Sequence, residues 1–350
     1  MRFFQLDARL FTAAKLARRV VDQRLGRSRP LFATFFVTRR CNVRCTGCWY
    51  YDVLDPALRA SEPDTATALA ILRRLGEAGV PVVQIAGGEP FLRRDLATLL
   101  RAGRDAGLSV AIITNGMLVS AAALGAVDEA CEWALYSPHV PEELAPENGQ
   151  RQYEQGWEGF RRMRRALSRP HLACAVTVSR LTVPRLGEIL GRALAAGADS
   201  VKFQPVFTPA LFPSPAEARH AVDVMGSFQA RYPDRIAVSA AFLSRFAAFF
   251  GPAPTVACTV RRFFHIGVHV DGTVCACCPM DQPLGSLLEA PLETLLARDV
   301  AEHHDCYGCQ RLDIVQALRL CGAEAPASAA GSVARRLRAR SLSVVGQVRE

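Results

Sequence analysis

The apolar and polar positions of this chain repeat one unit: a short apolar run, a turn, and then an amphipathic stretch. Six runs are apolar on both faces, which is typical of buried strands in a parallel sheet. These predicted strands are 31–38, 80–86, 108–114, 131–137, 172–178 and 200–206. Between them, 65–79 and 96–107 have helical spacing, and each ends at a glycine that suits a helix C-cap.

Six alternations of strand and helix predict a parallel βα architecture of the α/β class. The pattern alone leaves open a doubly wound sheet and a barrel, complete or partial. In either fold, the loops after the C-terminal ends of the strands carry the functional residues. Four unusual loops occupy these places: CNVRCTGC (41–48), GGEP (87–90), TNG (114–116) and SPH (137–139). Their coincidence on one rim favours a functional site there.

The character of the chain changes after about residue 250. The stretch HIGVHVDGTVCACC (265–278) predicts a β-hairpin, because two alternating runs flank Asp-Gly, a strong turn signal. A short helical piece at 285–296 and the sequence DCYGC (305–309) follow. We therefore expect a small second module rich in cysteine.

Composition and charge narrow the class of protein. The chain has 350 residues, of which 50% are hydrophobic, enough for one large domain or a large domain with a small one. No apolar run reaches the roughly 18 residues that a spanning helix needs, and the N-terminus lacks the apolar core of a signal peptide. With twelve cysteines, this favours metal binding or redox chemistry in the cytoplasm over a disulfide scaffold.

The net charge of +9 comes from the two ends of the chain. Residues 1–30 contribute +6 and residues 331–350 contribute +4, which leaves −1 for the 300 residues between them. Because that body lacks a basic stripe with interleaved aromatic residues, a nucleic-acid partner is not expected.

Three cysteines, Cys41, Cys45 and Cys48, lie within eight positions of the first loop. Thiolates this close can converge on one metal centre. One interpretation is a zinc site whose fourth ligand comes from elsewhere. The other is a [4Fe–4S] cluster held by three thiolates, with its fourth iron open to something other than protein. The spacing alone favours neither.

The Cys-x3-Cys-x2-Cys loop, followed by GGEP after the next strand, resembles the radical S-adenosylmethionine (SAM) enzymes over residues 32–210. The resemblance implies a partial (β/α)6 TIM-like barrel, with Cys41, Cys45 and Cys48 as ligands of a [4Fe–4S] cluster. SAM would chelate the open iron and be cleaved to methionine and a 5′-deoxyadenosyl radical, which abstracts hydrogen from a substrate. One position departs from the family: an aromatic residue usually precedes the third cysteine, and here Gly47 does, followed by Trp49 and Tyr50.

The resemblance also implies the residues that contact SAM. Gly87, Gly88, Glu89 and Pro90 would bind its amino group, and the two glycines would allow the backbone to approach a ligand closely. Further contacts would come from Ser137 to the ribose or carboxylate, and from Gln204 with Pro205 to the adenine.

Three other rim residues have alternative roles. Asn115 suits a SAM contact or an ordinary turn, and Arg180 a bond to the SAM carboxylate or a solvated surface. His139 lies on the rim that would face substrate, although a structural loop histidine is the simpler interpretation. No catalytic side chain is assigned. Cys131 and Cys174, within strands, are expected to be small buried hydrophobic residues.

The second cysteine group, with its hairpin and helical piece, resembles the SPASM/twitch extension of radical SAM enzymes. The resemblance implies one auxiliary [4Fe–4S] cluster, with Cys258, Cys277, Cys306 and Cys309 as its ligands. Cys275 and Cys278 compete for the second place, and only Cys321 follows the last pair. A zinc ribbon is the alternative for this group.

The first 30 residues predict a basic amphipathic helix that lies on an anionic membrane surface or packs against the closed end of the barrel. The predicted organisation is therefore 1–30 helix, 31–235 barrel, 236–325 auxiliary cluster domain and 326–350 basic tail. The location expected is the cytoplasm, with a peripheral position on the inner membrane face if the helix binds lipid.

The substrate expected first is a lipid or isoprenoid. It suits a membrane-bound enzyme, and a glycine before the third cysteine is also found in a hopanoid-synthesis branch of the family that adds adenosyl to a lipid. Alternatives are maturation of a ribosomal peptide, although only about 30 residues precede the barrel to hold a peptide-recognition domain, and dehydrogenation of a cyclitol or sugar. A flavodoxin- or ferredoxin-type protein would donate the electron. A non-catalytic Fe–S or zinc scaffold is the alternative from another class.

Overall fold

The computed structural model describes residues 30–48, 50, 62–236, 238, 240–250, 265–275 and 283–298. Within these residues the strands form one sheet in the order β6-β5-β4-β3-β2-β1-β7-β8-β9. Their bounds are β1 Phe32–Phe36, β2 Val82–Ala86, β3 Ser109–Thr114, β4 Cys131–Tyr136, β5 His171–Val178, β6 Ser200–Pro205, β7 His265–Val268, β8 Thr273–Cys275 and β9 Pro283–Ser286.

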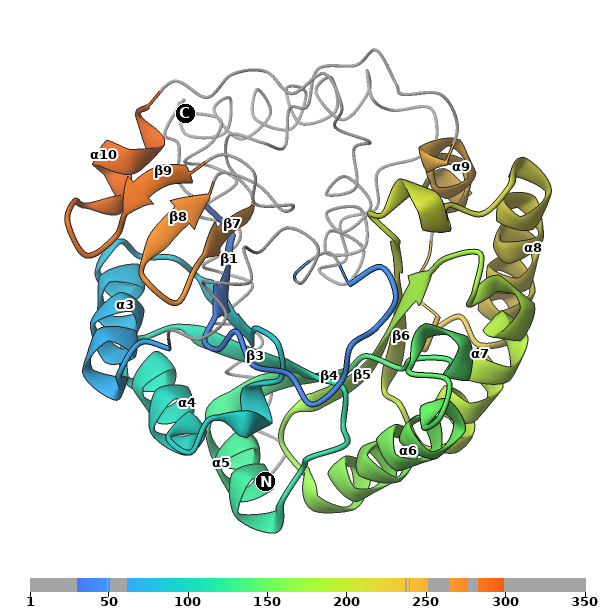
Figure 1. Ribbon diagram of the computed structural model, residues 1–350, viewed down its shortest axis with the longest axis horizontal. Helices are drawn as coiled ribbons and strands as arrows, with labels where there is room; N and C mark the ends of the chain where they lie inside the picture. The colour runs from blue at the N-terminus through green and yellow to red at the C-terminus, as the bar shows by residue number, and fades with distance from the viewer. Residues whose placement is uncertain are drawn as a thin grey trace, which may run out of the picture.

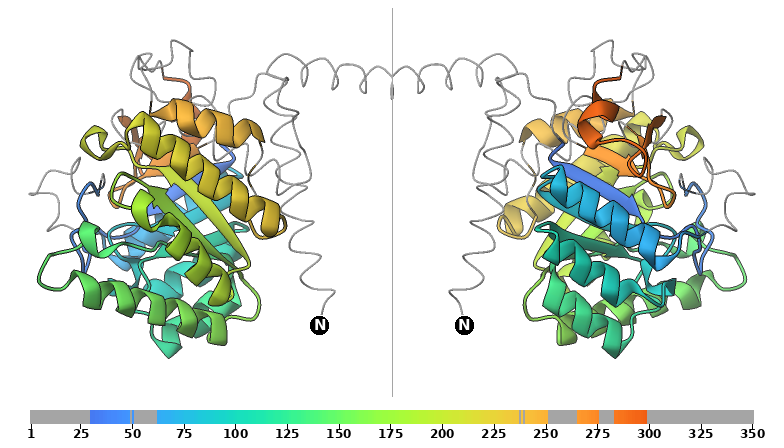
Figure 2. Two further views of the ribbon diagram at one scale, coloured as in Figure 1. Left: turned by 90° about the vertical axis from the view of Figure 1, so that its right-hand side faces the viewer. Right: turned by 90° about the vertical axis from the view of Figure 1, so that its left-hand side faces the viewer.

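Strands β1 to β6 are all parallel, and each pairs with the next one along the chain. The helices lie outside the arc of strands (Figure 1), and in the side views they run alongside the strands that they cover (Figure 2). Their bounds are α3 Thr65–Glu77, α4 Leu96–Asp105, α5 Ala121–Ala130, α6 Gly149–Ala166, α7 Leu186–Ala195, α8 Pro215–Arg231, α9 Ala240–Phe249 and α10 Leu292–Leu296. Because the order of the described strands starts at β6 and ends at β9, the sheet is open, and the predicted α/β partial barrel is confirmed.

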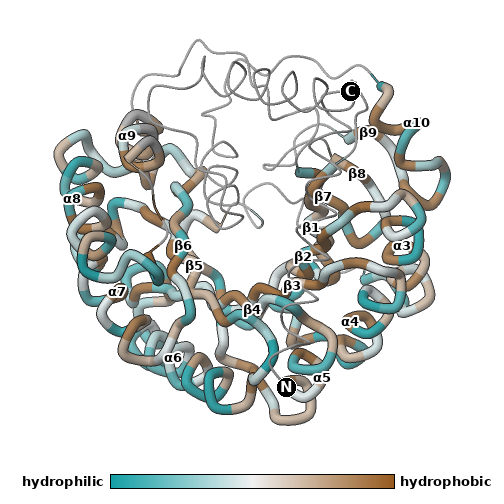
Figure 3. Tube along the Cα trace, turned by 180° about the vertical axis from the view of Figure 1, so that it is seen from behind, coloured by the Kyte–Doolittle hydropathy of each residue, from teal (hydrophilic) through white to brown (hydrophobic). Residues whose placement is uncertain are grey.

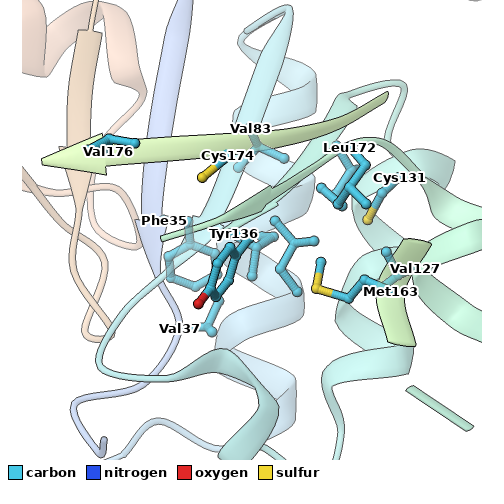
Figure 4. Packing of buried hydrophobic residues seen from close by; sticks show 14 of the residues in the cluster. Phe35, Val37, Val83, Val127, Cys131, Tyr136, Met163, Leu172, Cys174 and Val176 are labelled. Atoms are coloured by element: carbon cyan, nitrogen blue, oxygen red, sulfur yellow. The ribbon is translucent and has the colours of Figure 1, made fainter. Parts of the chain in front are cut away.

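Alternate residues of the strands face two different surroundings. One set packs under the helices in the main core, as Phe35, Val83, Tyr136 and Cys174 do in Figure 4. The other set faces the inside of the arc and forms smaller clusters, one of them built on Ala111, Leu135, Ala173 and Ala175. The strands are accordingly the hydrophobic inner layer in Figure 3, as the apolar runs predict. Cys131 and Cys174 are buried, as predicted.

Local signals set the helix ends. Asp64 is the N-cap of helix α3, and its side chain accepts a bond from the Thr67 N–H at 2.8 Å. Gly79 and Gly107, after the ends of α3 and α4, have φ of +67° and +77°. Only glycine adopts this conformation readily, so both predicted C-caps are confirmed.

The predicted hairpin around Asp-Gly exists as β7 and β8, which are antiparallel. It is not detached from the barrel, because β7 pairs in parallel with β1 from Phe32↔His265 to Phe35↔Val268. The prediction of one helical piece at 285–296 was wrong in its first half. There the chain forms β9 against β8, and only the five residues of α10 are helical.

Several predictions concern residues outside the described ranges. These are the N-terminal helix at 1–30 apart from Pro30, the tail at 326–350, and the auxiliary ligands Cys258, Cys277, Cys306 and Cys309. The domain boundaries therefore stay predictions. No helix among the described residues is long and apolar enough to cross a membrane.

A histidine in the pairing of β1 with β7 should make the free energy of unfolding depend on pH. His265 Nε2 lies 2.6 Å from Thr34 Oγ1, and burial lowers the pKa of His265 to about 4. The unfolded chain binds a proton near pH 6.5, so stability is fully present above that pH and is lost as the pH falls toward 4. We expect this histidine alone to account for up to about 3 kcal/mol of the loss.

The measurement is urea unfolding of the apoprotein at pH 7 and at pH 4.5. His265→Gln keeps a neutral polar side chain at both pH values, so it should lose less stability on acidification than the wild type. The control is His220→Gln, at an exposed position of α8. Equal losses in the wild type and His265→Gln would contradict the prediction.

Candidate active site

The pairing of β1 with β2 continues beyond both strands into the loops that follow. The continuing bonds are Val37 N–H to Ala86 O at 2.9 Å, Gly88 N–H to Thr38 O at 2.9 Å and Glu89 N–H to Arg40 O at 2.8 Å. The start of the cysteine loop therefore runs beside GGEP as an extension of the sheet.

The two glycines of GGEP make this contact possible. A Cβ on Gly88 would lie 2.0 Å from Arg40 O, and a Cβ on Gly87 would lie 2.5 Å from Thr38 O. Gly87 also has a φ of +147°, in the region that favours glycine. The sequence prediction assigned the glycines to the close approach of a ligand. In the structure, the side-chain space they leave is filled by the backbone of the cysteine loop.

Glu89 joins the loop after β2 to the loop after β3. Its carboxylate is 1% exposed and accepts bonds from the Phe91 N–H at 3.1 Å, the Thr114 hydroxyl at 2.8 Å and the Asn115 N–H at 2.9 Å. Burial raises the pKa of Glu89 to about 7, and the three hydrogen bonds only partly oppose this. The carboxyl is thus an internal anchor of the rim.

The cysteine loop is also tied to the opposite side of the barrel. The Thr46 N–H donates to Glu143 O at 2.8 Å, in the short helix η3 (Pro141–Glu143) after β4. The Thr208 hydroxyl donates to Gly47 O at 3.1 Å, just before the short helix η5 (Pro209–Leu211) after β6. The loop thus crosses from β1 toward β6, as the blue segment does in Figure 1.

Gly47, the position that departs from the family pattern, is fixed by its surroundings. Its φ is +74°, and a Cβ there would lie 2.1 Å from Leu211 Cδ1. Leu211 is buried and therefore fills the space that a side chain at position 47 would need. The sequence could not show this, because the two residues meet only in the fold.

The three cysteines of the loop are half-buried. Burial, with a smaller contribution from the charge of Glu89, raises the pKa of Cys41 to about 12. A bound iron would reverse this, since a coordinating thiol is deprotonated outright. No three His, Cys, Asp or Glu side chains of the described residues are arranged around a single metal ion. The donor set fits a cluster, in which each thiolate binds its own iron.

Two polar side chains from neighbouring loops contact the thiols. Asn115 Nδ2 lies 3.9 Å from Cys41 Sγ and 2.9 Å from Asn42 Oδ1. His139 Nε2 lies 3.6 Å from Cys45 Sγ, and its Nδ1 lies 3.7 Å from Glu143 Oε2. Burial lowers the pKa of His139, but the Cys45 thiolate and the Glu143 carboxylate outweigh burial and raise it well above 6.5.

The other predicted contacts are distributed along the same rim. Ser137 is half-buried, and its N–H donates to Thr114 O at 2.9 Å. Gln204 Nε2 donates to Thr177 Oγ1 at 2.9 Å on the inner face of the sheet. Arg180 is exposed. The structure therefore brings Asn115 and GGEP to the cysteines, whereas the contacts given for Ser137, Gln204 and Arg180 are with other rim residues or solvent.

Sequence reasoning missed Glu143, and it left His139 as either a rim residue facing substrate or, more simply, a structural loop histidine. Residues 45 and 139 are 94 positions apart, so no local pattern relates them. The one signal was that SPH follows a predicted strand at the same rim. Trp49 lies outside the described residues, and Tyr50 is buried against Phe36 with ring centroids 5.0 Å apart.

The fold and site together define a parallel βα barrel with three thiols on the loop after its first strand. Residues 35–184 match the model of the radical SAM superfamily. The chain therefore contains a domain of the radical SAM superfamily. Its members use a [4Fe–4S] cluster and SAM, which confirms these two predicted cofactors; the auxiliary cluster stays a prediction.

Curated relatives match a limited stretch of sequence. PqqA peptide cyclase of Gluconobacter oxydans is 37% identical over 103 residues, which cover 29% of this chain and 28% of the relative. Fe-coproporphyrin III synthase of Methanosarcina barkeri is 37% identical over 83 residues, 24% of this chain and 20% of the relative. The chain thus spans less than a third of the length of these two relatives.

Solved structures match over more of the fold. SuiB of Streptococcus suis bound to its precursor peptide SuiA has a TM-score of 0.61 and 14% identity, covering 81% of this chain and 68% of that chain. The enzyme anSMEcpe with bound SAM has a TM-score of 0.58 and 16% identity, covering 77% and 78%. At these identities the likeness establishes the fold alone.

We expect Gly47 and Leu211 to be coupled energetically. Gly47→Ala places a Cβ against Leu211 at a positive φ, which alone costs about 1–2 kcal/mol. Leu211→Ala removes the clash but not the backbone strain. In urea unfolding of the apoprotein, the double variant should therefore be less destabilised than the sum of the two single variants.

The matched control for this cycle is Gly187→Ala with Leu211→Ala. A Cβ on Gly187, in α7, meets nothing within 4 Å. Its effect should add to that of Leu211→Ala. If Gly47→Ala were additive in the same way, the packing of Leu211 against position 47 would be wrong.

Proposed function

We propose that this chain is a radical SAM enzyme whose Cys41, Cys45 and Cys48 hold the catalytic [4Fe–4S] cluster. The observation that carries the proposal is the pairing of the cysteine loop with GGEP at one barrel rim, within the stretch that matches the superfamily. When bound, the cluster supplies the electron that cleaves SAM to methionine and a 5′-deoxyadenosyl radical.

The chain's own residues hold the cysteine loop and GGEP in place relative to each other. The ladder from β1 and β2 sets where Cys41 lies relative to GGEP, and buried Glu89 fixes GGEP to the loop after β3. By the family resemblance, the 87–90 stretch would receive the amino group of SAM, and Ser137 and Gln204 would lie on the side of its ribose and adenine. Arg180, being exposed, could serve the SAM carboxylate only from the edge of the rim.

We further propose a peptide as the substrate. PqqA peptide cyclase and SuiB with its precursor peptide both act on or bind peptides by name, and anSMEcpe has been solved with bound peptides. These names support peptide maturation better than the lipid substrate expected from the N-terminal helix and from Gly47. The lipid and the cyclitol or sugar become outcomes of the test.

Other parts of the function stay proposals that the described residues do not bear on. An electron donor of the flavodoxin or ferredoxin type would reduce the cluster from outside the chain. An auxiliary cluster on the C-terminal cysteines, and binding of residues 1–30 to the inner membrane face, both concern residues outside the described ranges.

The cleavage of SAM tests the first proposal. After anaerobic reconstitution, we expect about four irons for this cluster, or eight with an auxiliary cluster, and formation of 5′-deoxyadenosine with a chemical reductant. Cys41→Ala should abolish that product. Intact cleavage in Cys41→Ala would overturn the assignment.

A second variant tests the contact between GGEP and the cysteine loop. Gly88→Ala forces GGEP away from Arg40 O by steric overlap. A misplacement of about 1 Å can lower a rate about 100-fold, so 5′-deoxyadenosine formation should fall by about that factor. Gly191→Ala, in α7 with open space around its Cβ, is the control and should retain wild-type activity.

The class of substrate can be tested without knowing its identity. The source organism is grown on deuterated medium, and its extract is separated into peptide, lipid and small-molecule fractions. Hydrogen abstraction transfers deuterium into 5′-deoxyadenosine, which mass spectrometry detects. We expect enrichment with the peptide fraction. Enrichment only with the lipid or the small-molecule fraction would replace the peptide proposal with that class.

A further inference from the structure

A short polar chain leads from the cysteine loop into the interior beneath the loops after β4 and β5. It starts at Cys45 Sγ, which lies 3.6 Å from His139 Nε2. The other ring nitrogen, Nδ1, lies 3.7 Å from Glu143 Oε2. The Ser179 hydroxyl, 0% exposed, then donates to Glu143 Oε1 at 3.4 Å. The imidazole is thus placed between a cluster ligand and a carboxylate.

Glu143 is held firmly enough to orient the ring. It is 6% exposed, and its Oε2 also accepts the Val140 N–H at 3.1 Å. Its backbone oxygen accepts the Thr46 N–H, one residue after Cys45. The same residue therefore fixes both the loop that carries the sulfur and the ring that faces it.

We propose that His139 is a positioning residue that donates an Nε2–H hydrogen bond to Cys45 Sγ and so raises the reduction potential of the cluster. The inference rests on the proposed function. A thiolate bound to iron only accepts hydrogen bonds, so the ring must present N–H to it. Such a bond withdraws electron density from the sulfur and stabilises the reduced cluster.

Asn115 does not supply the same bond to Cys41 as directly. Its Nδ2 is 2.9 Å from Asn42 Oδ1 but 3.9 Å from the sulfur, and its Oδ1 accepts the Met117 N–H at 3.0 Å. Asn115 chiefly shapes its own turn. Of these two contacts, the one from His139 is the shorter and is backed by a buried carboxylate.

The proposal predicts how substitutions change the midpoint potential of the cluster in the reconstituted full chain. This potential is measured by electron paramagnetic resonance on samples poised at a series of potentials. The signal of this cluster is identified as the one that Cys41→Ala lacks. His139→Phe should lower the potential with unchanged iron content, His139→Gln should lie between it and the wild type, and Glu143→Gln should shift it less in the same direction. His220→Phe, on the exposed face of α8, should have the wild-type potential.

The contact can also be measured without a variant. In wild-type protein with ¹⁵N-labelled histidine, pulsed electron paramagnetic resonance of the reduced cluster should show the weak nitrogen hyperfine coupling of a hydrogen-bonded ring. The strong coupling of a directly bound nitrogen would make His139 a ligand and overturn the proposal. The absence of any coupling would also overturn it.

The outcomes separate this inference from the proposed function. A wild-type potential in His139→Phe with full iron would overturn the role of His139 and leave the radical SAM assignment intact. His139 would also be a ligand if His139→Phe lost iron, His139→Gln did not restore it, and the wild type showed strong ¹⁵N coupling. A wild-type protein that assembles no cluster would overturn both.

Discussion

The site depends on the hydrogen-bond ladder between β1 and β2 running on past the ends of both strands. A parallel ladder has a fixed register, so continuing it to Glu89 and Arg40 fixes the cysteine loop relative to GGEP without any metal. The register holds only because Gly87 and Gly88 have no Cβ to separate the two backbones. Buried Glu89 then extends the constraint to β3 through Thr114 and Asn115. One half of the barrel mouth is therefore built from sheet hydrogen bonds and from the bonds of one buried carboxylate.

Much of the fold followed from local sequence, and the reason is physical. Strands buried on both faces have to be apolar throughout, so each of the six barrel strands was found close to its observed bounds. Glycine at positive φ marked the ends of α3 and α4. The pairing of β7 with β1 was not predictable in this way, because it joins segments about 230 residues apart and leaves no periodic trace in either. β9 was missed because its four residues are too short to show an alternation.

In the site, too, contiguous motifs were predictable from sequence and contacts between distant residues were not. Cysteine spacing and GGEP are contiguous motifs, so sequence could place them on one rim, and the structure agrees. The partners that hold the cysteine loop from the far side are single residues of other loops: Glu143, Thr208 and Leu211. Their types are ordinary for loops, and only the closed arc of strands brings them to the cysteines. The glycine before the third cysteine was an unexplained departure in sequence, and Leu211 supplies its steric reason.

The cysteine loop is thus held from two sides of the barrel mouth. The β1-to-β3 side carries the motifs shared with the superfamily and sets the position of the cluster loop. Gly47 with Leu211, and His139 with Glu143, act on the same loop from the other side, where the inner face of β6 also carries Lys202 opposite Ala175. A change on this side can alter the loop's shape or the electron density on Cys45 while the β1–β2 ladder stays intact. The β1-to-β3 side therefore fixes where the cluster loop lies, and the β4-to-β6 side acts on its shape and, through His139, on Cys45.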